Sequence, residues 1–216
     1  MKRILALGAF LLLLFAGFTV LIAKVDVAPI GCGSTDVGFS SLNAEANQLF
    51  GQHETIYKIT EVLGYATWGV VALFGLLGLS QLISRRSLLK VDRDILALGG
   101  GYAVMLACYV LFEKLAINYR PVFSAFTEPE PSYPSSHTLM LVFVMATAMM
   151  QIAHRVKSTG LRRILMLLCL LTALAVVCGR LVCGVHWLTD IVGALILAEA
   201  LAVLYYGVAF AADSER

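Results

Sequence analysis

The stretch ILALGAFLLLLFAGFTVLIA, residues 4–23, is an apolar run without a single charged side chain. A helix of this length crosses the hydrocarbon core of a bilayer, which is about 30 Å thick and needs about 20 residues at about 1.5 Å each. The whole chain has the same character, since 60% of its 216 residues are hydrophobic and only 14% are charged, against about 25% charged in soluble domains. The sequence therefore predicts an integral membrane protein.

Five further runs are long and apolar enough to be membrane spans. They are too long and alternate too little for strands of a β-barrel, so they indicate helices. We predict an all-α fold, a six-span transmembrane helical bundle that forms one membrane domain over residues 1–216, with an outer loop at 25–58 and a short surface helix at 43–50. A cleaved signal peptide is an alternative interpretation of the first run. The predicted spans are residues 4–23, 59–83, 95–117, 138–152, 164–183 and 187–210.

The basic residues lie mostly on one side of this predicted bundle. Six spans put both chain ends and two short loops on that side, and short loops rich in Lys and Arg stay in the cytoplasm. We therefore predict cytoplasmic termini. The net charge of +2 says little by itself, and because the basic residues follow the membrane topology, no nucleic-acid partner is predicted. Eleven of the 16 Lys and Arg are on the predicted inner side: Lys2, Arg3, Arg85, Arg86, Lys90, Arg93, Arg155, Lys157, Arg162, Arg163 and Arg216.

Polar residues gather instead at the outer ends of four predicted spans. A charged residue at membrane depth is costly and marks a functional site. Several cations around one point suit a phosphate group, and histidines there suit nucleophilic attack and proton donation. His186 and Asp190 are four residues apart, so on a helix they share one face and the carboxylate can orient the imidazole. The cluster comprises Lys114, Arg120, Ser135, Ser136, His137, Arg180, His186 and Asp190.

The spacing of these residues resembles the type 2 phosphatidic acid phosphatase family, which shares a core with the vanadium haloperoxidases. The family pattern is K-x6-R-P, then P-S-G-H, then S-R-x5-H-x3-D. The third part is Gly179-Arg180, five residues, His186, three residues and Asp190, so only the serine is replaced. The second part is the run Pro134-Ser135-Ser136-His137, and the first is Lys114, five residues and Arg120-Pro121.

The resemblance implies a role for each residue. His186 is the nucleophile that forms a phosphohistidine, Asp190 orients it, and His137 protonates the leaving group and later activates water. Arg120, Arg180 and Lys114 hold the phosphoryl oxygens, and the Ser135 hydroxyl and the Ser136 amide add hydrogen bonds. No metal or other cofactor is implied, because the arginines supply the charge that Mg²⁺ supplies in other phosphoryl-transfer enzymes.

Three departures from the pattern need a structural answer. Lys114 is one residue closer to Arg120 than in the family, and Glu113 occupies the family position. One residue rotates a helical side chain by about 100°, so either the helix unwinds before Arg120, or the lysine reaches back, or Lys114 does not bind phosphate. Ser136 replaces a glycine and Gly179 a serine.

Glu61 faces the same side as the cluster. A structural pair with Lys58 is the favoured interpretation of this residue, and contact with the substrate is the alternative.

The resemblance and the residues together predict a metal-independent lipid phosphate phosphatase of a bacterial plasma membrane, with its active site on the outer face. Phosphatidic acid, phosphatidylglycerol phosphate and undecaprenyl diphosphate present the same group, so the pattern does not choose among them. The alternative is a non-catalytic protein that binds or translocates a lipid phosphate. A haloperoxidase needs a bound vanadate and suits a membrane bundle poorly. The oligomeric state is not predicted.

Overall fold

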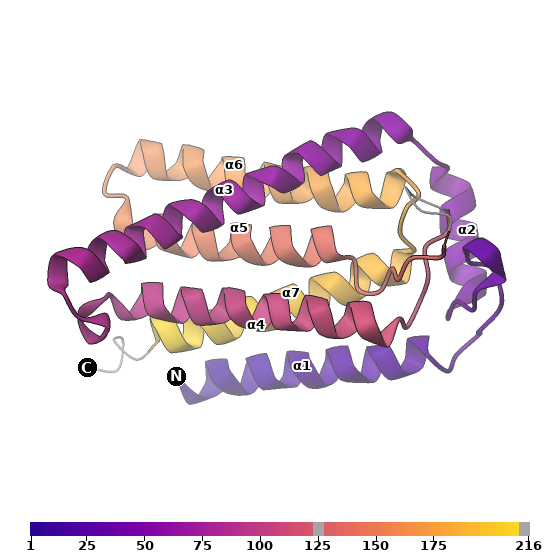
Figure 1. The fold of residues 1–216 in the computed structure, drawn as a ribbon, viewed down its shortest axis with the longest axis horizontal. Coiled ribbons are helices and arrows are strands. Elements are labelled where there is room, and N and C mark those ends of the chain that lie inside the picture. The colour runs from indigo at the N-terminus through magenta and orange to yellow at the C-terminus, as the bar shows by residue number, and fades with distance from the viewer. Residues whose placement is uncertain (123–127, 212–216) are drawn as a thin grey trace.

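The computed structural model describes residues 1–122 and 128–211, and in this part it is helical without a β-strand (Figure 1). Six helices are long and apolar enough to cross a membrane, so the predicted six-span all-α fold is confirmed. Arg216, which we expected on the inner side, lies outside the described residues. The α-helices are α1 (Lys2–Ile22), α2 (Ser40–Phe50), α3 (Glu54–Arg85), α4 (Arg93–Leu115), α5 (Ser136–Arg155), α6 (Thr159–Val182) and α7 (Leu188–Ala209), with short 3-10 turns η1 (Cys32–Ser34) and η2 (Leu88–Lys90).

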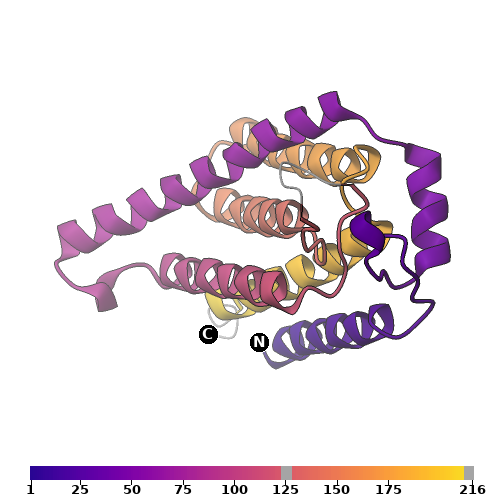
Figure 2. The same cartoon turned by 45° about the vertical axis from the view of Figure 1, so that its right-hand side comes forward.

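The six long helices run along a common direction, and the short helix α2 lies across one end of them (Figure 2). α1 begins and α7 ends at the opposite end, as an even number of spans requires. The predicted surface helix is therefore present, and its start is fixed by Asp26. The Asp26 carboxylate accepts hydrogen bonds from the Ser41 amide at 2.8 Å and the Ser40 hydroxyl at 2.9 Å. These bonds lower the pKa of Asp26.

Helix α7 is the centre of the bundle and packs against α1, α4 and α5. Small residues along it, among them Gly193, Ala194 and Ala198, let neighbouring helices approach closely, which is how helices gain packing contacts where lipid supplies no hydrophobic drive. The ring of Tyr133 packs in this region against Phe15 and Phe112, with centroids 6.1 and 5.9 Å away. The core therefore fixes the start of α7, where the polar cluster lies.

A polar network holds the end of the bundle opposite α2. Arg155 of α5 donates to the Asp94 carboxylate of α4 at 2.5 Å and to Asp92 at 3.2 Å. Asp92 also pairs with Arg85 of α3 at 2.7 Å, and that guanidinium lowers the pKa of Asp92. Basic residues that the sequence marks as topology signals thus also tie three helices together.

Helix α3 is much longer than a membrane requires. Its 32 residues extend over about 48 Å at about 1.5 Å per residue, and it crosses the other helices obliquely (Figure 1). A span longer than the hydrocarbon core is accommodated by such a tilt. The tilt brings the first turns of α3 over the ends of α5 and α6.

Candidate active site

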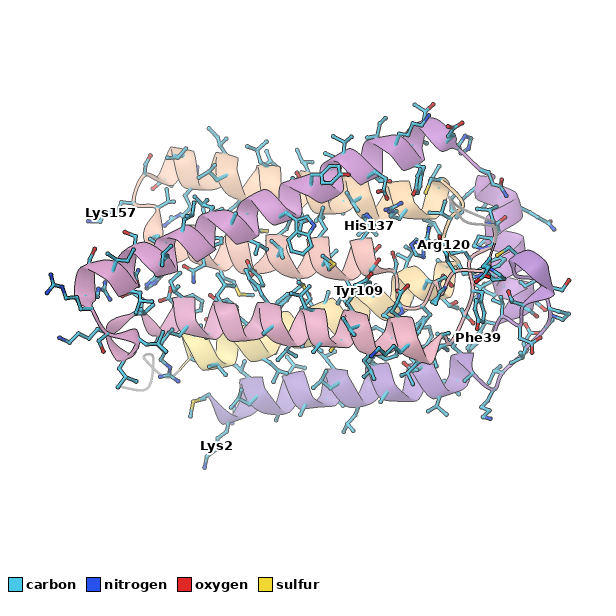
Figure 3. The ribbon with its side chains drawn as sticks, viewed as in Figure 1. Lys2, Phe39, Tyr109, Arg120, His137 and Lys157 are labelled. Atoms are coloured by element: carbon cyan, nitrogen blue, oxygen red, sulfur yellow. The ribbon has the colours of Figure 1, made fainter. Side chains whose placement is uncertain are left out.

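The polar cluster lies at the α2 end of the bundle. Figure 3 shows Arg120 near that end and Tyr109 and His137 between it and the middle of the bundle, with Lys2 and Lys157 toward the other end. The ends of α4 and α6 and the starts of α5 and α7 meet here, as the parity of the six spans predicts. Residues far apart in the sequence are therefore brought to one depth.

A cavity of about 150 Å³ occupies this meeting point. Its polar lining combines a guanidinium, two imidazoles, a carboxylate and two serines, one of which is in the first turn of α5, where free backbone amides favour an anion. Aromatic and apolar groups complete the wall. The lining residues are Tyr109, Phe112, Glu113, Arg120, Pro131, Ser132, Tyr133, Pro134, Ser136, His137, Leu139 and His186.

His186 lies in the tight connection between α6 and α7. Gly184, with φ of +73°, reverses the chain there, a backbone conformation that glycine adopts without strain. The imidazole is 3% exposed, and neither ring nitrogen has a hydrogen-bond partner within residues 1–122 and 128–211. Burial lowers the pKa of His186; the Asp190 carboxylate raises it, and the charges of Arg120 and Arg180 lower it further. The ring is thus a buried neutral base that faces the cavity.

Asp190 is held by hydrogen bonds to residues other than His186. Its Oδ2 accepts the Trp187 amide at 2.9 Å, at the start of α7, and lies 3.6 Å from His186 Nδ1. That separation is longer than a hydrogen bond. The other carboxylate oxygen accepts from Asn118 Nδ2 at 3.3 Å. The carboxylate is fully buried and lies four residues after His186, on the side of Nδ1.

The two arginines differ in their surroundings. Arg120 lines the cavity and its Nε lies 3.2 Å from the Glu130 carboxylate. Arg180 is 1% exposed, lies over the Tyr57 ring at 5.1 Å, and forms a close ion pair with Glu61 of α3. Its Nε and Nη1 find no hydrogen-bond partner in the described part of the chain. A buried guanidinium with donors to spare is suited to binding an anion.

His137, in the first turn of α5, contacts Glu61 as well. Its Nε2 lies 3.1 Å from Glu61 Oε1, the same oxygen that pairs with Arg180. The favoured interpretation of Glu61 from the sequence is wrong, because Lys58 pairs with Glu54 at 2.7 Å instead. Residues 54 and 58 are one helical turn apart, whereas Glu61 lies on the side of α3 that faces α5 and α6.

The two serines before His137 take different places. Ser136 lines the cavity, but Ser135 is fully buried and its hydroxyl donates to Thr138 Oγ1 at 3.0 Å. The Ser135 amide donates to the Asp190 carbonyl at 3.1 Å. The structure therefore does not bring the Ser135 hydroxyl to the cavity; this residue joins the starts of α5 and α7.

Lys114, like Arg180 and Asp190, is a predicted site residue that does not line the cavity. α4 ends at Leu115, where Ala116 adopts a left-handed conformation with φ of +46°, so the helix does stop well before Arg120. Lys114 is nevertheless exposed, and Glu113 lines the cavity in its place. The one-residue shift accounts for this, because neighbouring helical residues point about 100° apart.

Two residues that support the site escaped the sequence interpretation. Asn118 is fully buried; besides its bond to Asp190, its side-chain oxygen accepts the Gly38 amide at 3.1 Å. Asn43 of α2 accepts the Thr189 amide at 3.2 Å and donates to the Thr189 hydroxyl at 2.9 Å. Both asparagines thus hold the outer loop against the start of α7. A single asparagine, in the loop after α4 or on the short helix α2, gives no periodic signal.

The geometry agrees with comparisons to known proteins. The family model described as the PAP2 superfamily matches residues 112–213, which contain all eight residues of the predicted cluster. This part of the chain is similar to the PAP2 superfamily. The resemblance drawn from the three motifs is thus confirmed, while no curated protein sequence matches the chain.

Two solved structures are similar to this chain. The first is the transmembrane PAP2-type phosphatidylglycerolphosphate phosphatase from Bacillus subtilis, with a TM-score of 0.65 and 14% identity over 96% of each chain. The second is LpxE from Aquifex aeolicus, with a TM-score of 0.44 and 24% identity over 76% of this chain and 94% of that one. The first likeness establishes a transmembrane PAP2 fold, and at these identities it says nothing of the substrate.

Proposed function

We propose that this chain is a phosphatase that hydrolyses the phosphomonoester or diphosphate of a membrane lipid through a phosphohistidine on His186, as one membrane domain over residues 1–216. The observation that carries the proposal is the unpartnered imidazole of His186, buried in a cavity that Arg120 and His137 also line. Such a histidine is suited to attack phosphorus, because it is neutral, has a buried carboxylate on one side and shares its cavity with a guanidinium.

The chemistry follows from the positions of the two histidines. Nδ1 of His186 faces Asp190, which leaves Nε2 to attack phosphorus. As the P–N bond forms, the P–O bond to the lipid breaks, and His137 donates its proton to the departing oxygen. Water then attacks the phosphohistidine while His137 takes a proton from it, and the P–N bond breaks to release phosphate. Arg120 and Arg180 neutralise the charge that develops on the phosphoryl oxygens.

The surroundings of the cavity support a lipid substrate. A volume of about 150 Å³ is smaller than the roughly 300–1,000 Å³ of drug-sized pockets, so the phosphate enters and the rest of the substrate stays outside. A second pocket of about 220 Å³ shares Tyr109, Ser136 and His137 with it. Further along, α3 and α4 enclose an apolar groove of about 610 Å³. A hydrocarbon chain in this groove keeps its head group at the cavity.

The sidedness of the reaction is part of the proposal. The basic loops around Arg85 and Arg162 lie at the end of the bundle opposite the cavity (Figure 1). Because basic loops remain in the cytoplasm, the cavity faces the outer side of the membrane, and both termini are cytoplasmic. A bacterial plasma membrane is also part of the proposal, which rests here on the simple six-span topology.

Phosphate release from purified protein tests the proposal. The full chain in detergent is incubated with phosphatidic acid, phosphatidylglycerol phosphate and undecaprenyl diphosphate, with and without EDTA. We expect release from at least one lipid, unchanged by EDTA, and none from His186→Ala, whereas His53→Ala, an exposed histidine at the same end, remains active. Activity that survives in His186→Ala refutes the mechanism, and loss with EDTA refutes metal independence. Binding without release favours the non-catalytic alternative.

A further inference from the structure

Glu61 makes an unusual contact for a residue beside a phosphate site. One oxygen of its carboxylate reaches both Arg180 and His137, the latter at 3.1 Å. Under the proposed function these two side chains hold the phosphoryl oxygens and deliver the proton. The carboxylate thus occupies Nη2 of Arg180 and Nε2 of His137, two donors that an entering phosphate would also use, while Nε and Nη1 of Arg180 stay without a partner among the described residues.

The contact is built into the packing of α3. A Cβ atom on Gly179, next to Arg180, would lie 2.4 Å from the Thr60 methyl, and a Cβ on Gly64 would lie 3.1 Å from the His137 ring. Glycines on α6 and on α3 itself therefore allow the helices to approach closely on both sides of Glu61. The position of the Glu61 carboxylate is therefore set by the close packing of the helices around it.

The two partners of the ion pair differ in their freedom to move. Arg180 is 1% exposed and is held over the Tyr57 ring, whereas the Glu61 side chain is 33% exposed. Glu61 also lines the pocket of about 220 Å³, together with Tyr65 and Trp68. The carboxylate has space to turn into this pocket, while the guanidinium stays in place.

We infer that Glu61 sets the affinity of the site for phosphate, by competing with the phosphoryl group for Arg180 and His137. This inference rests on the proposed function. As a phosphoryl group enters, the Glu61 carboxylate turns into the neighbouring pocket, and it returns to the two donors as inorganic phosphate leaves. The site is never left with an uncompensated buried guanidinium, which is costly. The consequence is weaker binding of substrate and faster release of product.

Direct binding of inorganic phosphate measures this competition without any turnover. If the carboxylate is turned away in about one molecule in ten, removing its charge tightens phosphate binding by about tenfold, because apparent affinity scales with the competent fraction. We expect that gain in calorimetric titrations of Glu61→Gln, and the same gain in phosphate inhibition of lipid hydrolysis. Glu54→Gln is the matched control, since it makes the same change on the same helix at an exposed residue.

The competing explanation is that Glu61 only holds α3 or His137 in place. In that case Glu61→Gln binds phosphate as the wild type does, or more weakly, and either result overturns the inference, as does failure of both proteins to bind phosphate. Glu61→Asp provides a second variant if the first does not fold; its shorter side chain reaches the donors less well, so an intermediate gain is expected and no gain refutes. A wild type that binds phosphate but releases none from any lipid refutes the proposed function alone.

Discussion

Restoring the family serine at position 179 is expected to damage this protein. The family pattern has a serine before the arginine, and Gly179→Ser recreates it. In this fold, however, a Cβ at residue 179 lies 2.4 Å from Thr60 Cγ2, where ordinary contact begins at 3.4 Å. The helices must therefore separate by about 1 Å, since 3.4 less 2.4 is 1.0. Glu61, the residue after Thr60, then moves away from Arg180.

The magnitude follows from the overlap. Forcing an extra group into a well-packed contact costs about 1–3 kcal/mol, and for a chain of this size about 1 kcal/mol lowers the melting temperature by about 2–4 °C. A displacement of about 1 Å at a catalytic site costs up to about 100-fold in rate. We expect Gly179→Ser to lower both the apparent melting temperature in detergent and kcat/KM for the lipid phosphate.

The rescue makes the test specific. Thr60→Ser removes the methyl that clashes and keeps the hydroxyl that donates to the Tyr57 carbonyl at 2.8 Å. The double variant should recover most of the lost stability and activity. Gly69→Ser is the control on α3, because a Cβ there has no neighbour within 4 Å among the described residues. A stable, fully active Gly179→Ser refutes this account of the contact, as does a double variant no better than the single one.

Three further outcomes follow from the site and the core. Lys114→Ala is expected to keep kcat/KM within about twofold and Arg120→Ala to lose about 100-fold, the typical cost of one charged donor; equal losses refute the placement of Lys114. Since burial holds the pKa of His186 below 6.5, the acid limb of kcat/KM should lie below that pH, with activity lost as pH falls and the ring is protonated. In Asp190→Asn the acid limb of the residual activity should lie at a still lower pH, because the carboxylate that raises the pKa of His186 is gone. An acid limb above pH 6.5 contradicts this reasoning. Arg155→Met removes the cation beside the buried Asp94 carboxylate, which keeps its hydrogen bond from Gln151 at 2.9 Å, and should cost up to about 3 kcal/mol of stability, seen as a lower melting temperature than in wild type.

The fold could be predicted because membrane helices are recognised by their length and composition. Each predicted span has a counterpart in the structure, and the parity of the basic loops places four helix ends together. The prediction was least accurate for the second span, expected at 59–83, because α3 begins at Glu54 and runs to Arg85. Its polar ends do not look like a membrane span, so composition does not reveal that the helix continues past the hydrocarbon.

The spacing of residues in the sequence predicted only part of the site. His186 and Asp190 share a helical face whatever the rest of the fold does, and the structure places them accordingly. Whether Ser135 or Ser136 faces the cavity depends on the turn before α5, where one residue changes the direction completely. Asn118 donates to Asp190, 72 residues away, and Asn43 donates to Thr189, 146 residues away. No local sequence pattern indicates such distant pairs.

Gly179 and Glu61 show that the effect of a departure from the family pattern depends on which residues the fold places beside it. Taken alone, a glycine in place of serine removes one hydroxyl from the arginine motif. In the structure it also lets α3 approach α6 closely enough for Thr60 to pack there, and so brings a carboxylate onto Arg180. The loss of a hydroxyl and the gain of a competing anion are thus two results of one substitution. A variant with the serine and without the Thr60 methyl separates them, because it restores the packing while keeping the hydroxyl.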